Sequence, residues 1–521
     1  MDAKRLTETQ KFTSDIAWVA LSQVFIGLTG LVTLPALTKC YSSEIYGVWA
    51  QMIVTVALLT PILTLQLRTA TVRFLAAEED REKRRRAFGA MLWPVLAFAC
   101  LVLIMSLLLR QDLSIFLFAS PQYISLIPLT FLWAAMEALL LFALSYLRAR
   151  GKIKRLSIIL LALAVIKMAV IVSLATTGYS LGWILAFIII GEAILVAAVF
   201  SMIIREIGFP KPALEGLKHY LSFSVPQIPA GALLWVISAS SRYFITHFLN
   251  LSQTGAYTAS YTLGNLIYLL YMPIGFVLLP AVSKFWEQKE LTKTRNYFEY
   301  STRLFLTLAI PAAAGLYILS QPLLGILTTS EYMVGGSLVL LIALGIIFYG
   351  LYGINVYVIY LVEQTKWLPL MIGIAAATNA GINIALIPKI GIMAAAISTI
   401  VSYFILATIV TVWARRAIGY KMDFKFLGKV VGATVIMAFC LRFIPTTSGW
   451  YVILAIIAGA AIFALGLWLL KGFSVQDRKL IKETIRALNP KLLRGKSNME
   501  DEIASSRHGK QQKSDKSVNE D

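Results

Sequence analysis

The chain has 521 residues, of which 58% are hydrophobic and 14% are charged, and its mean hydropathy is +0.76. A soluble protein of this length needs a far more polar surface, so the composition excludes an ordinary soluble domain. The net charge of +20 does not indicate nucleic-acid binding, because the Lys and Arg residues stand at the ends of apolar segments rather than on one soluble face.

Apolar segments of about 20 residues can cross a bilayer core about 30 Å thick as helices. They predict an all-α integral membrane protein with about 14 transmembrane helices. In chain order, the predicted spans are residues 16–38, 46–67, 89–109, 122–147, 156–176, 181–204, 221–247, 258–282, 302–321, 336–362, 367–387, 391–414, 427–444 and 451–471. Beyond them, residues 474–488 predict an amphipathic helix on the membrane surface, and the polar residues 495–521 predict a disordered tail.

The positive charges alternate from one connection to the next. Of the 47 Lys and Arg residues, 41 lie in alternate connections or in the terminal segments, and four, Lys39, Arg110, Lys389 and Arg442, lie in the other connections. Positively charged connections remain on the cytoplasmic side of a membrane. We therefore expect a multi-pass protein of the plasma membrane with both termini in the cytoplasm.

A weak internal repeat relates the two halves of the chain. Residues 42–50 follow the first span and residues 251–259 follow the seventh, so the period is about 210 residues, or six spans. Because six is even, the halves have the same orientation and form parallel repeats. This predicts a first lobe of spans 1–6 (residues 1–210), a second lobe of spans 7–12 (211–420), an appended helix pair (421–472) and a cytoplasmic segment (473–521).

Charged side chains within predicted spans are the strongest functional candidates, because an isolated charge facing lipid is costly. Glu137, Lys167 and Glu192 lie near the middle of spans four, five and six, at matching distances from the turns between them. Two interpretations remain open. The three residues form a buried ion pair that locks the spans together, or Lys167 contacts a ligand in a water-filled cavity.

Arg242 is the other cation within a span, and no acidic partner is evident in span seven. It follows Pro226 and Pro229, which are expected to bend the helix so that it lines a cavity. A guanidinium group suits phosphate or carboxylate. Arg68 and Arg73, after span two, are either anchors at the membrane interface or guards of an entrance.

Tyrosines and amides gather in spans eight and ten, where they suit a sugar ligand or ordinary core packing. The candidates are Tyr268, Tyr352, Asn265 and Asn355. No catalytic or metal-binding constellation is evident, since the three histidines, His219, His247 and His508, are scattered. The sequence contains no phosphate-binding P-loop motif. We therefore expect a transporter without a cofactor, and leave open whether H⁺ or Na⁺ drives it.

Two motifs resemble a known family. Residues 34–49 (LPALTKCYSSEIYGVW) resemble the first loop of Wzx-type polysaccharide flippases, in the multidrug/oligosaccharidyl-lipid/polysaccharide (MOP) exporter superfamily. Residues 391–396 (GIMAAA) resemble the opening of their span twelve, with Ala394 where Gly is usual. The resemblance implies a fourteen-span exporter fold. It also implies flipping of an undecaprenyl- or dolichyl-pyrophosphate-linked oligosaccharide between leaflets, with membrane lipids and glycan-assembly machinery as partners.

Three alternatives remain. A cation-coupled multidrug exporter of the same fold usually has an acid deep in span one, whereas Asp15 lies at the start of that span. A second alternative is a lipid-II-type flippase for a cell-wall precursor. A membrane-embedded glycosyltransferase or polymerase would need an acidic catalytic pair and a large outer loop, and the outer loops here are short.

Overall fold

A computed structural model describes residues 2–213, 215–445 and 448–472, with side chains from Trp18 onward except at residue 20. The described part of the chain consists of helices and their connections and contains no strand. Fourteen of its helical segments are long and apolar enough to cross a membrane. The predicted all-α membrane fold is confirmed. The amphipathic helix predicted at 474–488 and the tail at 495–521 lie outside the described residues.

The first lobe contains six spans, the second of which continues into a short helix. Its helices are α1 (Asp2–Cys40), α2 (Ser43–Leu63), α3 (Leu67–Leu75), α4 (Arg81–Leu108), α5 (Arg110–Phe118), α6 (Leu126–Ala149), α7 (Ile153–Thr176) and α8 (Leu181–Ile207), with a 3₁₀ turn at Pro121–Tyr123. Helix α6 is central, since it packs against α2, α3, α4 and α8. Its apolar side chains therefore form the middle of the lobe's core.

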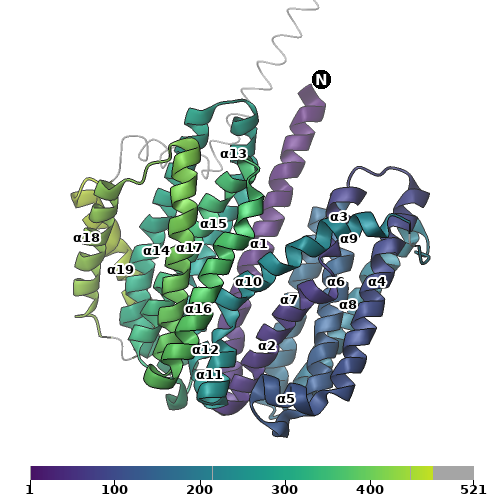
Figure 1. Ribbon diagram of the computed structural model, residues 1–521. Coiled ribbons are helices and arrows are strands. Elements are labelled where there is room, and N and C mark those ends of the chain that lie inside the picture. Colours follow the sequence, from purple (N-terminus) through teal and green to yellow (C-terminus); the bar gives the residue numbers. More distant parts are fainter. Residues whose placement is uncertain (1, 214, 446–447, 473–521) are drawn as a thin grey trace, which may run out of the picture.

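The second lobe also contains six spans, two of which are interrupted. Its helices are α9 (Leu217–Ser224), α10 (Ile228–Ala239), α11 (Ser241–Phe248), α12 (Leu251–Gly264), α13 (Ile267–Glu287), α14 (Leu291–Leu327), α15 (Gly336–Leu361), α16 (Leu368–Ile390) and α17 (Ile392–Ile418), with 3₁₀ turns at Val225–Gln227, Ser330–Tyr332 and Thr365–Trp367. The pair α18 (Phe424–Leu441) and α19 (Gly449–Leu469) packs on α14 at the outer edge of this lobe (Figure 1).

The two ends of the helical bundle differ in charge. One end, called here the basic end, carries the connections with Arg81–Arg86 and Arg148–Arg155; it is at the top of Figure 1. The other, called the far end, carries α5, α11 and the start of α2 and α12. The assignment of the basic end to the cytoplasm stays a prediction from charge.

Three spans are interrupted. Span two breaks between α2 and α3, where Leu65 and Gln66 have left-handed φ angles of 48° and 51°. Span eight breaks between α12 and α13, and span seven breaks at a 3₁₀ turn beside Pro226. The proline-rich break in span seven agrees with the sequence-based expectation, whereas span eight begins earlier than predicted and is broken.

The start of span seven packs on the first lobe. The Phe74 ring of α3 lies 4.8 to 5.5 Å from the rings of His219, Tyr220 and Phe223 on α9. Helix α10 then crosses to α16 of the second lobe (Figure 1). By these contacts, α9 lies against the first lobe and α10 against the second, so span seven bridges the two lobes. The boundary at 210/211 stays a prediction.

Candidate functional site

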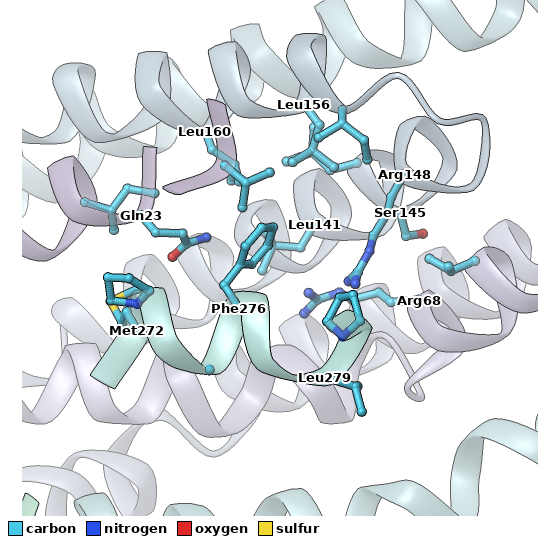
Figure 2. Close-up of a pocket in the computed structure, with 18 of the residues that line it drawn as sticks. Gln23, Arg68, Leu141, Ser145, Arg148, Leu156, Leu160, Met272, Phe276 and Leu279 are labelled. Atoms are coloured by element: carbon cyan, nitrogen blue, oxygen red, sulfur yellow. The ribbon is translucent and has the colours of Figure 1, made fainter. Parts of the chain in front are cut away.

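A cavity of about 1110 Å³ lies between the lobes. Its wall comes from α1, α3, α6 and α7 of the first lobe and from α13 and α15 of the second (Figure 2). Arg148 at the end of α6 and Ile153 at the start of α7 line it, which places the cavity in the half of the molecule toward the basic end. This volume slightly exceeds the range of about 300–1,000 Å³ that is usual for small-molecule binding sites.

Two arginines supply the charge of this cavity. Arg68 and Arg148 both line it, and Figure 2 shows their guanidinium groups directed into the space between α6 and α13. Their charges act on each other, and neither forms an ion pair with a described carboxylate. The described lining residues include no Asp or Glu. The wall is therefore cationic.

The position of Arg68 follows from the break in span two. Helix α2 ends at Leu63, and the left-handed residues Leu65 and Gln66 turn the chain before α3 begins at Leu67. Non-glycine residues in this region are strained and persist where the surrounding structure holds them. The turn lets the start of α3, with Arg68 and Thr69, contribute to the cavity wall.

The remaining wall combines aromatic and amide groups with apolar surface. Tyr268 and Tyr271 of α13 and Tyr357 of α15 line the cavity from the second lobe. Gln23 of α1 and Ser145 of α6 face it from the first lobe (Figure 2). Such a wall offers hydrogen-bonding groups and flat rings beside the two cations, which is a surface suited to a polar, anionic ligand.

Other sequence candidates lie away from this wall. Tyr352 and Asn355 of α15 are buried in the core of the second lobe, where the Asn355 amide donates to Leu351 O and Thr411 Oγ1. Asn265 caps the end of α12. Among these polar candidates, Tyr268 alone lines the cavity. A sugar-binding role for the others stays a prediction.

The three charges of spans four to six meet inside the first lobe. The Lys167 Nζ donates to Glu137 Oε2 at 2.6 Å and lies 2.8 Å from Glu192 Oε1. Glu192 is fully buried and also accepts from Trp133 Nε1 at 3.0 Å. Of the two interpretations offered by the sequence, the structure therefore contains the ion pair. Lys167 does not line the cavity in this state, and contact with cargo stays a prediction.

Arg242 is buried near the far end, on α11. Its Nε donates to Thr258 Oγ1 and its Nη1 donates to Ser238 O, both at 3.3 Å. Its guanidinium lies 4.4 Å from the ring centroid of Tyr261, a cation–π contact. It forms no ion pair with a described carboxylate and is 6% exposed. Arg242 is thus a further cation without a described carboxylate partner, at the opposite end of the molecule from the cavity.

Arg73 has a different environment from Arg68. Its guanidinium stacks at 4.4 Å over the ring of Phe223 on α9, and it is absent from the cavity lining. The two residues were predicted together as interface anchors or entrance guards. Arg68 lines the cavity, while Arg73 joins α3 to α9.

Helices α2 and α12 close the space between the lobes at the far end. A Cβ added at Gly47 would lie 1.9 Å from Leu251 O, and one added at Gly255 would lie 2.1 Å from Ser43 O. The Ser43 and Ser252 hydroxyls hydrogen-bond at 2.6 Å. Because neither glycine can be replaced without moving backbone, the helices are in direct main-chain contact. These are the repeat-related segments 42–50 and 251–259.

Further hydrogen bonds tie the lobes together at this end. The Ser43 N–H donates to Glu331 Oε2 at 3.0 Å, and Thr38 Oγ1 donates to Leu327 O at 3.0 Å. The Tyr332 hydroxyl donates to Tyr41 O. The Ser43 N–H holds the pKa of the Glu331 carboxyl below its ordinary value. Glu331 therefore remains ionised at neutral pH and accepts an N–H at the start of α2, where a negative charge is favoured.

Sequence reasoning missed Arg148 as a site residue, because it stands at the end of a span like an ordinary interface anchor. The position of Arg148 along α6 could have identified it. Leu141, Leu144 and Ser145 line the cavity, and Arg148 follows on the same face of α6. Among the described residues, no group of three His, Cys, Asp or Glu side chains is placed to hold a metal ion.

The sequence is similar to those of polysaccharide biosynthesis proteins and of probable flippases. A sequence profile described as "Polysaccharide biosynthesis protein" matches residues 37–334. The chain is 21% identical over 228 residues to the probable low-salt glycan biosynthesis flippase Agl15 of Haloferax volcanii, an alignment that covers 44% of this chain and 48% of that protein. It is 26% identical over 240 residues to the probable lipid II flippase MurJ of Rhizobium meliloti, covering 43% of each chain. The aligned regions thus span about half the length of these relatives.

A solved structure has the same fold. The lipid II flippase MurJ in an inward closed conformation matches with a TM-score of 0.73 and 15% identity, over 89% of this chain and 99% of that one. The profile covers more than half of the sequence. The chain therefore belongs to the polysaccharide biosynthesis protein family and has the fold of MOP superfamily transporters.

Proposed function

We propose that this protein flips a polyprenyl-(pyro)phosphate-linked oligosaccharide from the inner to the outer leaflet of the plasma membrane, for assembly of a surface glycan. The two lobes would expose the central cavity to each side in turn, while both termini remain in the cytoplasm. No covalent bond changes in such transport. Membrane lipids and glycan-assembly proteins would be its partners.

The observation that carries this proposal is the pair of arginines in a cavity whose described wall contains no carboxylate. Guanidinium groups bind phosphate oxygens through charge-assisted, often bidentate hydrogen bonds. Arg68 is half-buried and Arg148 is exposed, so one cation stands deeper than the other along the wall. A diphosphate that enters from the basic end would meet both.

The rest of the cargo has suitable surroundings. The tyrosine and glutamine side chains of the wall offer rings and amides to a sugar, and the polyprenyl tail would remain in lipid between the lobes. Arg242 supplies a third cation, near the contact of α2 with α12 at the far end. Separation of that contact would open a path from Arg68 toward Arg242, as alternating access between parallel repeats requires.

The cationic cavity argues against a cation-coupled multidrug exporter, because a cationic drug would be repelled by Arg68 and Arg148 without an acid to bind it. A lipid-II-type precursor carries the same diphosphate and lipid chemistry. The names of two relatives, a glycan flippase and a lipid II flippase, both support a lipid-linked saccharide as cargo.

Substitution of the two cavity arginines tests the proposal. Each charge-assisted hydrogen bond contributes about 1.5–3 kcal/mol, so Arg68→Ala or Arg148→Ala should weaken binding of the diphosphate by roughly 10-fold to 100-fold. We expect surface glycan to fall strongly in each variant and further in the double variant. The measurement is surface glycan quantified against the amount of protein in the membrane.

Arg416→Ala is the matched control, because Arg416 is an exposed arginine at the basic end on α17, outside the cavity. It should retain normal surface glycan. Normal glycan in the Arg68→Ala/Arg148→Ala variant, at normal protein level, would contradict the proposed role of the cavity.

A further inference from the structure

The cluster of Glu137, Lys167 and Glu192, called here the triad, has an unbalanced charge. Two carboxylates share one ammonium at 2.6 and 2.8 Å, so the ionised triad carries a net charge of −1 within the membrane-spanning part of the fold. Glu192 is fully buried, and its Oε2 atom has no hydrogen-bond partner in the described structure. A buried carboxylate that is only half satisfied is costly unless it takes up a proton.

The triad lies on the deep continuation of the cavity wall. Glu137 is one helical turn from Leu141, on the face of α6 that carries Ser145 and Arg148 into the cavity. Lys167 is two turns beyond Leu160 on α7. The charges of Glu137 and Arg68 act on each other. The charge of the triad should therefore change the affinity of Arg68 for an anion.

The other elements packed around the triad contribute few charges. Helix α3 supplies Arg68, and α8 supplies Glu192 itself. Helix α2 presents the Trp49 ring, which stacks on Trp133 at 5.6 Å between centroids. Lys167 in turn lies 5.3 Å from the Trp133 ring centroid. Helix α1, which packs along α7, has no charged residue from Trp18 to Thr38. The described charges that act on the triad are therefore its own three members and Arg68.

We propose that the triad is a proton-binding site that is coupled to anion binding at Arg68 and Arg148. This inference rests on the proposed function of the cavity. When the triad is ionised, Glu137 competes with a phosphate for the charge of Arg68. A proton from solvent can form an O–H bond on one triad carboxylate, which brings the net charge of the triad to zero. Arg68 then interacts with the phosphate without competition from the triad. The two carboxylates titrate as a pair, so the proton belongs to the pair.

The chemistry favours a proton over a metal cation. The Lys167 ammonium already occupies the space between the carboxylates and would repel a second cation, whereas a proton needs a single oxygen such as Glu192 Oε2. Because linkage is reciprocal, if a proton strengthens anion binding, then the anion must draw in a proton. Anion affinity should then fall as pH rises, by up to about tenfold per pH unit.

The test is calorimetric titration of the purified full chain in lipid nanodiscs with inorganic pyrophosphate. Titrations in buffers of different ionisation enthalpy give the number of protons taken up on binding. We expect the natural protein to take up a proton beyond the contribution of pyrophosphate itself. Glu192→Gln and Glu137→Gln each hold the triad neutral, so both should bind pyrophosphate without that uptake. Glu82→Gln, at a half-buried carboxylate on α4 far from the triad in sequence, should keep it.

The outcomes separate the inference from the proposed function. Pyrophosphate binding that depends on Arg68 but takes up the same number of protons in the natural protein and in Glu192→Gln would overturn the proton site and leave the cavity assignment intact. If Glu192→Gln fails to fold, Glu137→Gln decides the same point. Absence of pyrophosphate binding, or binding unchanged by Arg68→Ala, would overturn the proposed function and the coupling with it.

Discussion

At the scale of single residues, the presence or absence of a partner separates the charged side chains. Lys167 has two carboxylates within 3 Å, so its charge holds α6, α7 and α8 together. Arg68 and Arg148 have none and remain free to bind an anion. Arg242 has hydroxyl, carbonyl and aromatic partners but no carboxylate in the described structure. The unpaired cations are therefore the better candidates for contact with cargo.

Replacement of Lys167 should destabilise the protein. Lys167→Ala leaves the partly buried Glu137 and the fully buried Glu192 without their cation. The loss of one member of a buried ion pair costs about 3–5 kcal/mol. We expect a lower midpoint of thermal unfolding for the detergent-solubilised variant, partly restored in Lys167→Ala/Glu137→Gln. Lys293→Ala, at an exposed ion pair on α14, should unfold like the natural protein. An unchanged midpoint for Lys167→Ala would mean that the triad does not lock the helices.

Part of this residue-level picture could be predicted from the sequence. Counting residues from the turns placed Glu137, Lys167 and Glu192 at one depth, because helical rise is constant. The same counting could not place Arg68, since its position depends on the left-handed residues Leu65 and Gln66, which carry no glycine or proline signal. Tertiary contacts hold that turn.

At the scale of helices, α2 and α12 form the contact that closes the far end. The sequence predicted that segments 42–50 and 251–259 are related, but a repeat does not reveal whether its two copies are in contact. Gly47 and Gly255 allow the contact, because the main chains of α2 and α12 approach each other at both positions. The breaks of spans two and eight, after α2 and α12, are likewise found in both copies.

A side chain at Gly47 should hold this contact open. Gly47→Val places its Cβ against Leu251 O, which cannot move without shifting α12. With the three native cysteines replaced, spin labels at Asp112 and Met333, exposed far-end positions of the two lobes, should report a longer distance in Gly47→Val than in the natural protein. Gly315→Val is the control, because a Cβ at Gly315 meets nothing within 4 Å. Equal distances in all three proteins would show that the contact does not govern the far end.

At the scale of the whole molecule, the two lobes are joined by main-chain contact at the far end and separated by a cavity toward the basic end. If the basic end is cytoplasmic, as the charge distribution predicts, this is the state that would load cargo from the inner leaflet. The fourteen spans could be predicted from the length of the apolar runs. The parallel orientation of the two lobes stays a prediction from the even repeat. The cavity could not be predicted, because it depends on how far the lobes tilt apart.

Under the proposed function, the protein moves a lipid-linked, anionic saccharide across the bilayer. The direct measurement uses proteoliposomes that contain the purified chain and a fluorescent polyprenyl-diphosphate-linked oligosaccharide, with a membrane-impermeant quencher added outside. We expect a second, protein-dependent phase of quenching beyond the fraction of label in the outer leaflet. This phase should be slower with Arg68→Ala/Arg148→Ala and unchanged with Arg416→Ala. Quenching that stops at the outer-leaflet fraction, as in protein-free vesicles, would contradict the proposed function.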